Sequence, residues 1–264
     1  MDGEDVDEAT AQVHEHPIVE WGARLGFTIV GVLHLIIGYI ALKVAWGFGG
    51  GTQNADSTGA LQTMASSPFG PVLLWMCVAG FVLLGLWSVT EGLLDRHNLV
   101  DFAKRVGKGA GYLFLAWTAF KIVALGSTGD SSEQTQGLTA AAMSTGIGRV
   151  AIGAVGVGII GVAGYHVYKG LSRRFLQDLQ EHPRQWVIRI GQIGYTAKGF
   201  ALGVVGYFFC YAALTADPNK TTGLDGALKS FNEGAAGPYV LSAVAAGIGA
   251  YGMYSFARAK YASL

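Results

Sequence analysis

Long apolar blocks alternate with shorter polar stretches along the chain. A bilayer core of about 30 Å needs about 20 helical residues to cross it. Because every backbone group inside lipid must be hydrogen-bonded, such a block is a helix unless it alternates like a barrel strand, and these blocks do not. The pattern predicts an all-α integral membrane protein with six transmembrane helices, at residues 22–46, 71–94, 107–125, 149–170, 190–214 and 239–257.

The six blocks form three similar pairs. Each pair opens with a basic residue followed by glycines, as in RLGFTIVG at 24–31, and ends in a motif such as GLWSV at 85–89. Aligned on its glycine, this motif places Trp87, His166 and Tyr254 at one equivalent position. Two spans per repeat give all repeats the same orientation, which predicts three parallel hairpins in a pseudo-threefold bundle. The repeats cover residues 21–97, 98–174 and 189–264.

The segments between the spans carry their own patterns. Residues 1–20 hold seven acidic residues and no Lys or Arg, which predicts a disordered cytoplasmic tail. Residues 175–188 form an amphipathic cytoplasmic linker, interpreted as an extension of the fourth helix that ends before Pro183. The three outward loops place apolar residues three or four apart, which predicts one short amphipathic helix in each, within 57–70, 135–148 and 221–238.

Composition and charge support a membrane location and predict its orientation. Charged residues make up only 14% of the chain and hydrophobic residues 51%, whereas soluble proteins carry about 25% charged residues. Twelve Lys and Arg residues lie on one side of the predicted spans and five on the other. This bias predicts a multi-pass protein with both termini in the cytoplasm. A net charge of zero argues against a nucleic-acid partner.

Glycine is unusually frequent, with 40 residues in 264, against an average near 7%. Small residues at helical spacing let transmembrane helices approach closely. Close packing is therefore the first interpretation, and a glycine-lined conduit is the alternative. The residues expected to pack are Gly22, Gly26, Gly107, Gly111, Gly158, Gly199, Gly203 and Gly247. Cys77 and Cys210 lie inside apolar blocks and are expected to be small buried side chains.

Four ionisable residues inside the spans are candidates for binding. His34 lies near mid-bilayer on the glycine-bearing face of its helix. It is either a neutral histidine bonded across a helix interface or a proton relay or ligand contact. Lys198 lies two turns inside the fifth helix and can extend to the cytoplasmic surface. His166 and Glu91 lie near the inner ends of even-numbered spans, where Glu91 can pair with charges of the linkers.

The sequence predicts no catalytic residues, metal site or cofactor. Motifs of zinc proteases, serine hydrolases and phosphate-binding loops are missing from the sequence. A haem held by His34 or His166 is an alternative, but a bis-histidine haem needs both ligands level. The depths of these two residues differ by about one helical turn, ~5 Å.

Three runs resemble a known family: TGALQTMASSPFGPVLLWMCVAGFVLLGLWSV, GRVAIGAVGVGIIGVAGYHVYKGL and GPYVLSAVAAGIGAYGMYSFARAKY. Together with the triplicated hairpin, they are similar to a bacterial membrane family, domain of unknown function number 1206. The resemblance covers about residues 21–261 and implies a two-helix unit repeated three times in a bacterial plasma (inner) membrane protein. It implies no activity and no catalytic residues.

Three functions remain open from the sequence. The first is a non-enzymatic scaffold or accessory subunit, whose partners would be the lipid bilayer and another membrane protein or a second copy of the chain. The second is a small-molecule or ion transporter or channel with a site at His34 near the pseudo-threefold axis. The third is a membrane-embedded enzyme that acts on lipid. The close-packed small residues and the few buried charges favour the first.

Overall fold

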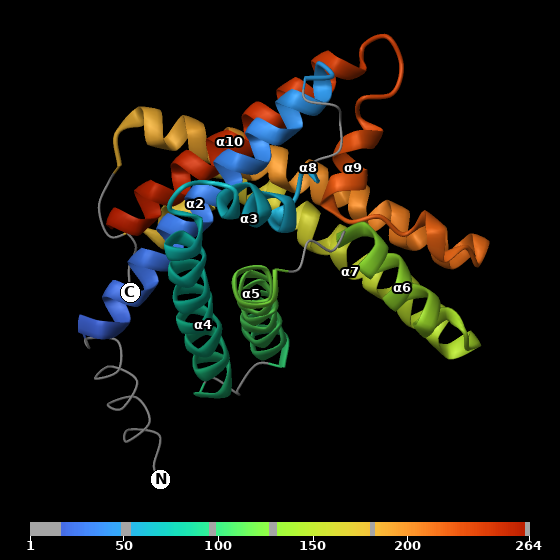
Figure 1. The fold of residues 1–264 in the computed structure, drawn as a ribbon, viewed down its shortest axis with the longest axis horizontal. Helices are drawn as coiled ribbons and strands as arrows, with labels where there is room; N and C mark the ends of the chain where they lie inside the picture. The colour runs from blue at the N-terminus through green and yellow to red at the C-terminus, as the bar shows by residue number, and fades with distance from the viewer. Residues whose placement is uncertain (1–16, 49–53, 95–98, 127–130, 180–182, 262–264) are drawn as a thin grey trace. The chain divides into compact units, whose positions relative to one another are not determined.

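The computed structural model describes residues 17–48, 54–94, 99–126, 131–179 and 183–261. Regular structure in these residues is entirely helical, which confirms the predicted class (Figure 1). The nine α-helices of this part are α2 (Pro17–Ala45), α3 (Ser57–Ala65), α4 (Gly70–Leu94), α5 (Leu99–Leu125), α6 (Ser131–Met143), α7 (Gly146–Leu171), α8 (Gln185–Thr215), α9 (Leu224–Ser230) and α10 (Gly237–Tyr261). Two 3-10 helices, η1 (Arg174–Asp178) and η2 (Pro218–Lys220), complete it.

Each predicted span falls on one long helix, and the first extends one residue past the end of α2. Five of these helices are long and apolar enough to cross a membrane, as judged over the described residues: α2, α4, α7, α8 and α10. The predicted third span lies in α5, which is not among the five. Lys108 and Lys121 interrupt its apolar stretch, so no membrane-length segment of α5 is as apolar as those of the five. The chain is therefore membrane-like in five helices, and the count of six spans remains a prediction.

The first helix begins earlier than the hydropathy pattern predicts. α2 begins at Pro17, a residue favoured in the first turn of a helix. Residues 17–20, expected in the acidic tail, are therefore helical, and the tail prediction for 1–16 lies outside the described residues. A polar segment can continue a helix beyond the bilayer, and hydropathy alone does not detect that continuation.

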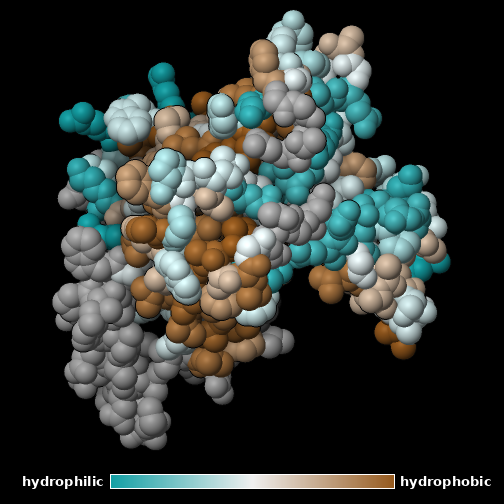
Figure 2. Space-filling model, viewed as in Figure 1, coloured by the Kyte–Doolittle hydropathy of each residue, from teal (hydrophilic) through white to brown (hydrophobic). Residues whose placement is uncertain are grey.

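The chain divides into two compact units, and the first comprises residues 1–30, 61–127 and 255–264. In this unit α4 and α5 pack side by side (Figure 1). A Cβ atom added to Gly109 would lie 2.9 Å from the Gly85 carbonyl oxygen, so small residues allow this approach. Figure 2 shows apolar side chains gathered over α4 and α5. Val72 and Trp75 of α4 are exposed. A surface of this kind suits lipid better than water.

The second unit comprises residues 31–60 and 128–254. Here α7 packs on α8, and a Cβ at Gly199 would lie 2.7 Å from the Ala163 carbonyl oxygen. The C-terminal half of α2 packs on α10, where a Cβ at Gly38 would lie 2.8 Å from the Ala245 carbonyl oxygen. In both units, therefore, the second span of one repeat contacts the first span of another through glycine.

These contacts correct the alignment of the second repeat. A Cβ at Gly109 would meet the Gly85 carbonyl and the Val89 amide, whereas one at Gly199 would meet the Ala163 carbonyl and the Val167 amide. Gly85 is therefore matched by Ala163 and not by Gly164. By this register Trp87 corresponds to Tyr165, so the predicted equivalence with His166 is wrong by one residue. The sequences had been matched on a shared glycine, but the interface uses the alanine before it.

The loops predicted to carry short helices do so, as α3, α6 and α9. In the second unit, a carboxylate links two of these loops. The buried Asp225, in the first turn of α9, accepts a hydrogen bond of 2.7 Å from the Ala55 amide and forms an ion pair of 2.7 Å with Lys229. Asp56 accepts the Gly59 amide at the start of α3. Asp56 thus caps the first turn of α3, and Asp225 satisfies a buried amide just before that helix.

The linker after α7 differs from its prediction. α7 ends at Leu171 instead of extending toward Pro183, and Arg173 adopts a left-handed backbone with φ of 58°. The left-handed residue ends the α-helix, and the 3-10 helix η1 follows. This turn directs Phe175 into the interior, where its side chain is fully buried.

Candidate functional site

Three of the four predicted ionisable residues meet around two tyrosines in the second unit. The ring centroids of His34 in α2 and Tyr251 in α10 lie 4.7 Å apart, and the Lys198 Nζ lies 4.1 Å from the Tyr251 ring centroid. The His166 ring in α7 lies 5.8 Å from that of Tyr195 in α8. The two tyrosine rings contact each other edge to face at 5.2 Å. We call these five residues, with Phe175 and Tyr254, the tyrosine cluster.

Glycines make room for the rings of this cluster. A Cβ at Gly194 would lie 2.5 Å from the Tyr251 amide nitrogen and Cα, so α8 approaches the backbone of α10 at this residue. One helical turn earlier, a Cβ at Gly191 would lie 2.5 Å from the Phe175 ring. In α7, Gly170 leaves space for Tyr195. The cluster therefore depends on three positions that carry no side chain.

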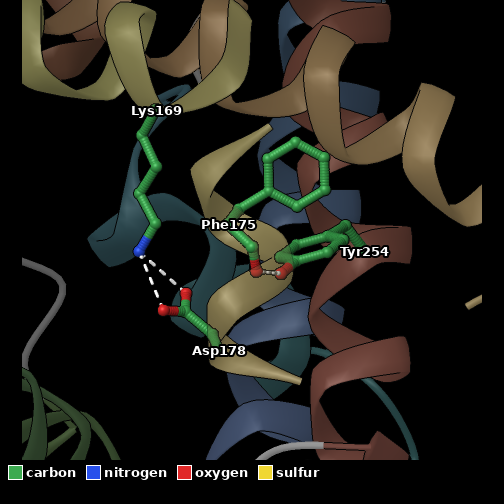
Figure 3. Close-up of polar contacts among 4 residues, drawn as sticks. All are labelled: Lys169, Phe175, Asp178 and Tyr254. Carbon is green, nitrogen blue, oxygen red and sulfur yellow. Dashed lines mark hydrogen bonds and ion pairs between the residues drawn. The ribbon is translucent and has the colours of Figure 1, made fainter. Parts of the chain in front are cut away.

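The 3-10 helix η1 closes one side of the cluster. The Tyr254 hydroxyl donates a hydrogen bond of 2.9 Å to the Phe175 carbonyl oxygen, and their rings meet edge to face at 5.1 Å (Figure 3). The Phe175 ring also stacks on Tyr195, with centroids 5.5 Å apart. Edge-to-face and offset-stacked rings of this kind attract each other by about 0.5–1.5 kcal/mol beyond their burial. Phe175 thus connects the linker to α8 and α10.

An ion pair lies beside these rings. The Lys169 Nζ lies 2.8 and 3.1 Å from the two carboxylate oxygens of Asp178, as Figure 3 shows. The same ammonium group lies 5.4 Å from the centroid of Tyr195, within the range of a cation–π contact. The pair therefore fixes the end of α7 to η1 while its cation contacts the cluster.

We expect this ion pair to contribute measurably to stability. The two side chains are 15% and 25% exposed, so the pair is more shielded than a surface pair. In a double-mutant cycle of Lys169→Met and Asp178→Asn, we expect a coupling energy of about 1 kcal/mol, the upper end for exposed pairs. The measurement is the free energy of unfolding in detergent micelles. A coupling energy near zero would show that the pair does not stabilise the fold.

Glu91, the fourth predicted residue, lies in the first unit. Its carboxylate forms an ion pair of 2.8 Å with Arg105, and each of the two side chains is about one-third exposed. This agrees with the interpretation that Glu91 pairs with a charge near a linker. An exposed pair of this kind contributes about 0–1 kcal/mol.

The glycines expected to pack divide into two groups. At Gly22, Gly26, Gly199 and Gly247, a Cβ would lie within 3.2 Å of a neighbouring helix, and at Gly203 it would reach Ala163 at 3.8 Å. At Gly107, Gly111 and Gly158, a Cβ would meet no atom within 4 Å, so a packing role for these three stays a prediction. Cys77 is buried as expected, whereas Cys210 is half-buried.

The chemistry of the cluster is that of packed rings and cations. The His166 Nδ1 lies 2.9 Å from the Val162 carbonyl oxygen, so this ring hydrogen-bonds within its own helix. Over the described residues, no three His, Cys, Asp or Glu side chains come together to hold a metal ion. Each histidine ring contacts a tyrosine ring. The cluster and the adjacent Lys169 thus combine two ammonium groups and two imidazoles with aromatic faces.

Sequence reasoning missed the two central tyrosines of the cluster. Tyr195 and Tyr251 are buried, yet neither was singled out from the sequence. A signal existed in the spacing: Gly191 and Gly194 lie three apart on one helix, and Tyr251 and Tyr254 lie three apart on another. The glycine pair defines a helix face without side chains, and the tyrosine pair defines a face with large side chains. The spacing does not show that the two faces meet.

Comparison with known proteins agrees with the repeats. The Domain of Unknown Function family DUF1206 matches three times, at residues 25–95, 103–173 and 193–262. The chain is 30% identical over 257 residues to the uncharacterised protein YxxB of Bacillus subtilis (strain 168), covering 93% of this chain and 92% of YxxB. No solved structure matches. Each match covers most of one helix pair, α2 and α4, α5 and α7, or α8 and α10, and the chain belongs to the DUF1206 family, whose domain of unknown function it carries three times.

Proposed function

We propose that the chain is a six-span protein of the bacterial plasma membrane, with three like-oriented hairpins around a pseudo-threefold axis and both termini in the cytoplasm. The distribution of Lys and Arg supports this orientation. The equivalent glycine contacts of α4 with α5 and of α7 with α8 support counting α5 as a span. The two helices of a hairpin also pack alike in repeats 1 and 3. In repeat 1, Gly26 of α2 faces Leu84 of α4, and in repeat 3, Gly194 of α8 faces Tyr251 of α10.

Within this architecture, the proposed role is that of a non-enzymatic scaffold or accessory subunit of a membrane complex. One observation carries the proposal: the ionisable side chains within the spans of the second unit contact aromatic rings and backbone groups. His34 and Lys198 contact Tyr251, and His166 contacts Tyr195 and its own helix. These contacts stabilise the packing of helices, which is what a scaffold requires. The expected partner is another membrane protein or a second copy of the chain.

Labelling of single cysteines tests the topology. In a Cys77→Ala/Cys210→Ala background, Lys104→Cys and Glu133→Cys place exposed thiols before and after the apolar part of α5. A membrane-impermeant maleimide added to intact cells should label position 133 and should reach position 104 only after permeabilisation. Equal labelling of both positions from outside would show that α5 does not cross, and the threefold proposal would fail.

Transport is the second candidate, because His34 and Lys198 contact the same tyrosine inside the helical part of the unit. Such a pair of groups could relay a proton or bind an anion. Proteoliposomes with imposed H⁺, Na⁺ or K⁺ gradients distinguish the two roles. The scaffold predicts the same leak for wild type, His34→Ala and empty vesicles, together with a particle larger than the monomer in native-like nanodiscs. A flux that requires His34, carried by a monomer, would replace the scaffold with a transporter.

A further inference from the structure

An apolar groove lies along the interface of α7 and α8 in the second unit. Its volume is about 640 Å³, and its walls include Val150, Gly153, Val157, Cys210 and Leu214. The helices touch beside it, where a Cβ at Gly156 would lie 2.8 Å from the Cys210 amide nitrogen. Because Gly153 has no side chain, the space beside Cys210 stays open. The volume falls in the range of about 300–1,000 Å³ that is usual for ligand sites.

One end of the groove is cationic. Arg149 lines it, and its Nε and Nη2 donate to the carbonyl oxygens of Ala213 and Leu214 at the end of α8. A guanidinium group has five N–H donors, so these two bonds leave donors for a further acceptor. Arg149 also lies in the first turn of α7, where the helix dipole places partial positive charge. The charge at this end therefore favours an anion.

The walls favour a hydrocarbon chain. Val150, Val157 and Leu214 are 73%, 64% and 77% exposed, a cost in water but not in lipid. Both helices are long and apolar enough to span a membrane, and Arg149 lies at the end of α7. In a helix that spans a bilayer, such an end lies at the depth of the phosphates. An apolar groove with a cation at the headgroup level matches an amphipathic anion.

We propose that this groove binds one acyl chain of an anionic glycerophospholipid, whose headgroup phosphate is held by Arg149. The inference requires that the protein be embedded in a membrane, but it does not depend on which side the Arg149 end faces. It also does not depend on whether the chain is a scaffold or a transporter. A bound lipid would fill the space beside Gly153 and neutralise a cation at the membrane surface.

Native mass spectrometry of the full chain in detergent micelles tests the site. The probes are dioleoyl-phosphatidylglycerol and dioleoyl-phosphatidylcholine, titrated against wild type, Arg149→Gln, Val150→Trp and Val155→Trp. Val150→Trp fills the groove without removing the bonds of Arg149 to α8, which guards against misfolding of the arginine variant. Val155 lies on the same helix, is also exposed and does not line the groove, so Val155→Trp is the matched control.

We expect the first phosphatidylglycerol to bind wild type about tenfold more tightly than phosphatidylcholine does, because both lipids carry a phosphate but only phosphatidylcholine carries a cationic choline group, which Arg149 repels. Arg149→Gln and Val150→Trp should each weaken it about tenfold, and Val155→Trp should leave it unchanged. Equal binding to all four proteins would show unspecific annular lipid and overturn the proposal. A wild-type dimer that Val150→Trp dissociates would also overturn it, because a second copy would then occupy the groove.

Discussion

Replacing Gly194 by alanine should destabilise the protein more than the same change at Gly170 or Gly191, the other glycines that border the tyrosine cluster. The added Cβ would lie 2.5 Å from the amide nitrogen and Cα of Tyr251. These are backbone atoms, which cannot rotate away as the end of a side chain can. Overpacking of this kind costs typically about 1–3 kcal/mol, and we expect about 3 kcal/mol because α8 and α10 must separate. The measurement is the free energy of unfolding in micelles.

Helix propensity acts in the opposite direction and provides the control. Alanine favours a helix interior over glycine by about 1 kcal/mol. At Gly161 in α7 an added Cβ would meet no atom within 4 Å, so Gly161→Ala should be neutral or stabilising. If both variants changed stability alike, the close approach of α8 to α10 would not be a feature of the folded protein.

The hydropathy pattern predicted the helices well because lipid imposes few alternatives. The block predicted at 71–94 is the helix Gly70–Leu94, and the block at 149–170 is Gly146–Leu171. In a bilayer, a long apolar segment must satisfy its own hydrogen bonds, so its length and its secondary structure follow together. The loop helices also follow from local spacing, as α3 and α9 show.

The hydropathy pattern gave wrong helix ends in two situations: where a helix continues past charged residues, and where a helix stops although the apolar pattern continues. α5 begins at Leu99 and α8 at Gln185, both several residues before the predicted spans at 107 and 190. Charged residues, Asp101, Lys104 and Arg105 in α5 and Arg189 in α8, separate these starts from the apolar part that hydropathy detects. The prediction for the end of α7 was wrong in the opposite direction. The left-handed Arg173 ends the helix, although an apolar face continues to Phe175.

The candidate site was predicted only in its charged members. His34, His166 and Lys198 can be found one at a time, because an ionisable residue in a span is costly wherever it lies. Their convergence on Tyr195 and Tyr251 depends on the register of α8 against α10 and of α2 against α10. That register is set by where backbones touch, at Gly194 and Gly38, and hydrophobic periodicity does not encode it.

Tyr254 should be the most sensitive side chain of the cluster. Its side chain is completely buried and contacts the rings of Phe175 and Tyr195, and its hydroxyl donates to the Phe175 carbonyl. Removing a buried aromatic ring typically costs about 3–5 kcal/mol. We expect Tyr254→Ala to lose that amount of unfolding free energy in micelles. Tyr254→Phe keeps the ring and should lose only the hydrogen bond, about 1 kcal/mol.

A local measurement separates this role of Tyr254 from general loss of stability. Because its hydroxyl fixes η1, both variants should speed amide hydrogen exchange at residues 172–179, and Tyr254→Phe should do so with little change elsewhere. Tyr207→Ala is the matched control, because Tyr207 is 56% exposed on α8 and lies outside the cluster. Should Tyr254→Ala resemble this control in both stability and exchange, Tyr254 would not join η1 to α10, and Phe175 would have to be held by its ring contacts alone.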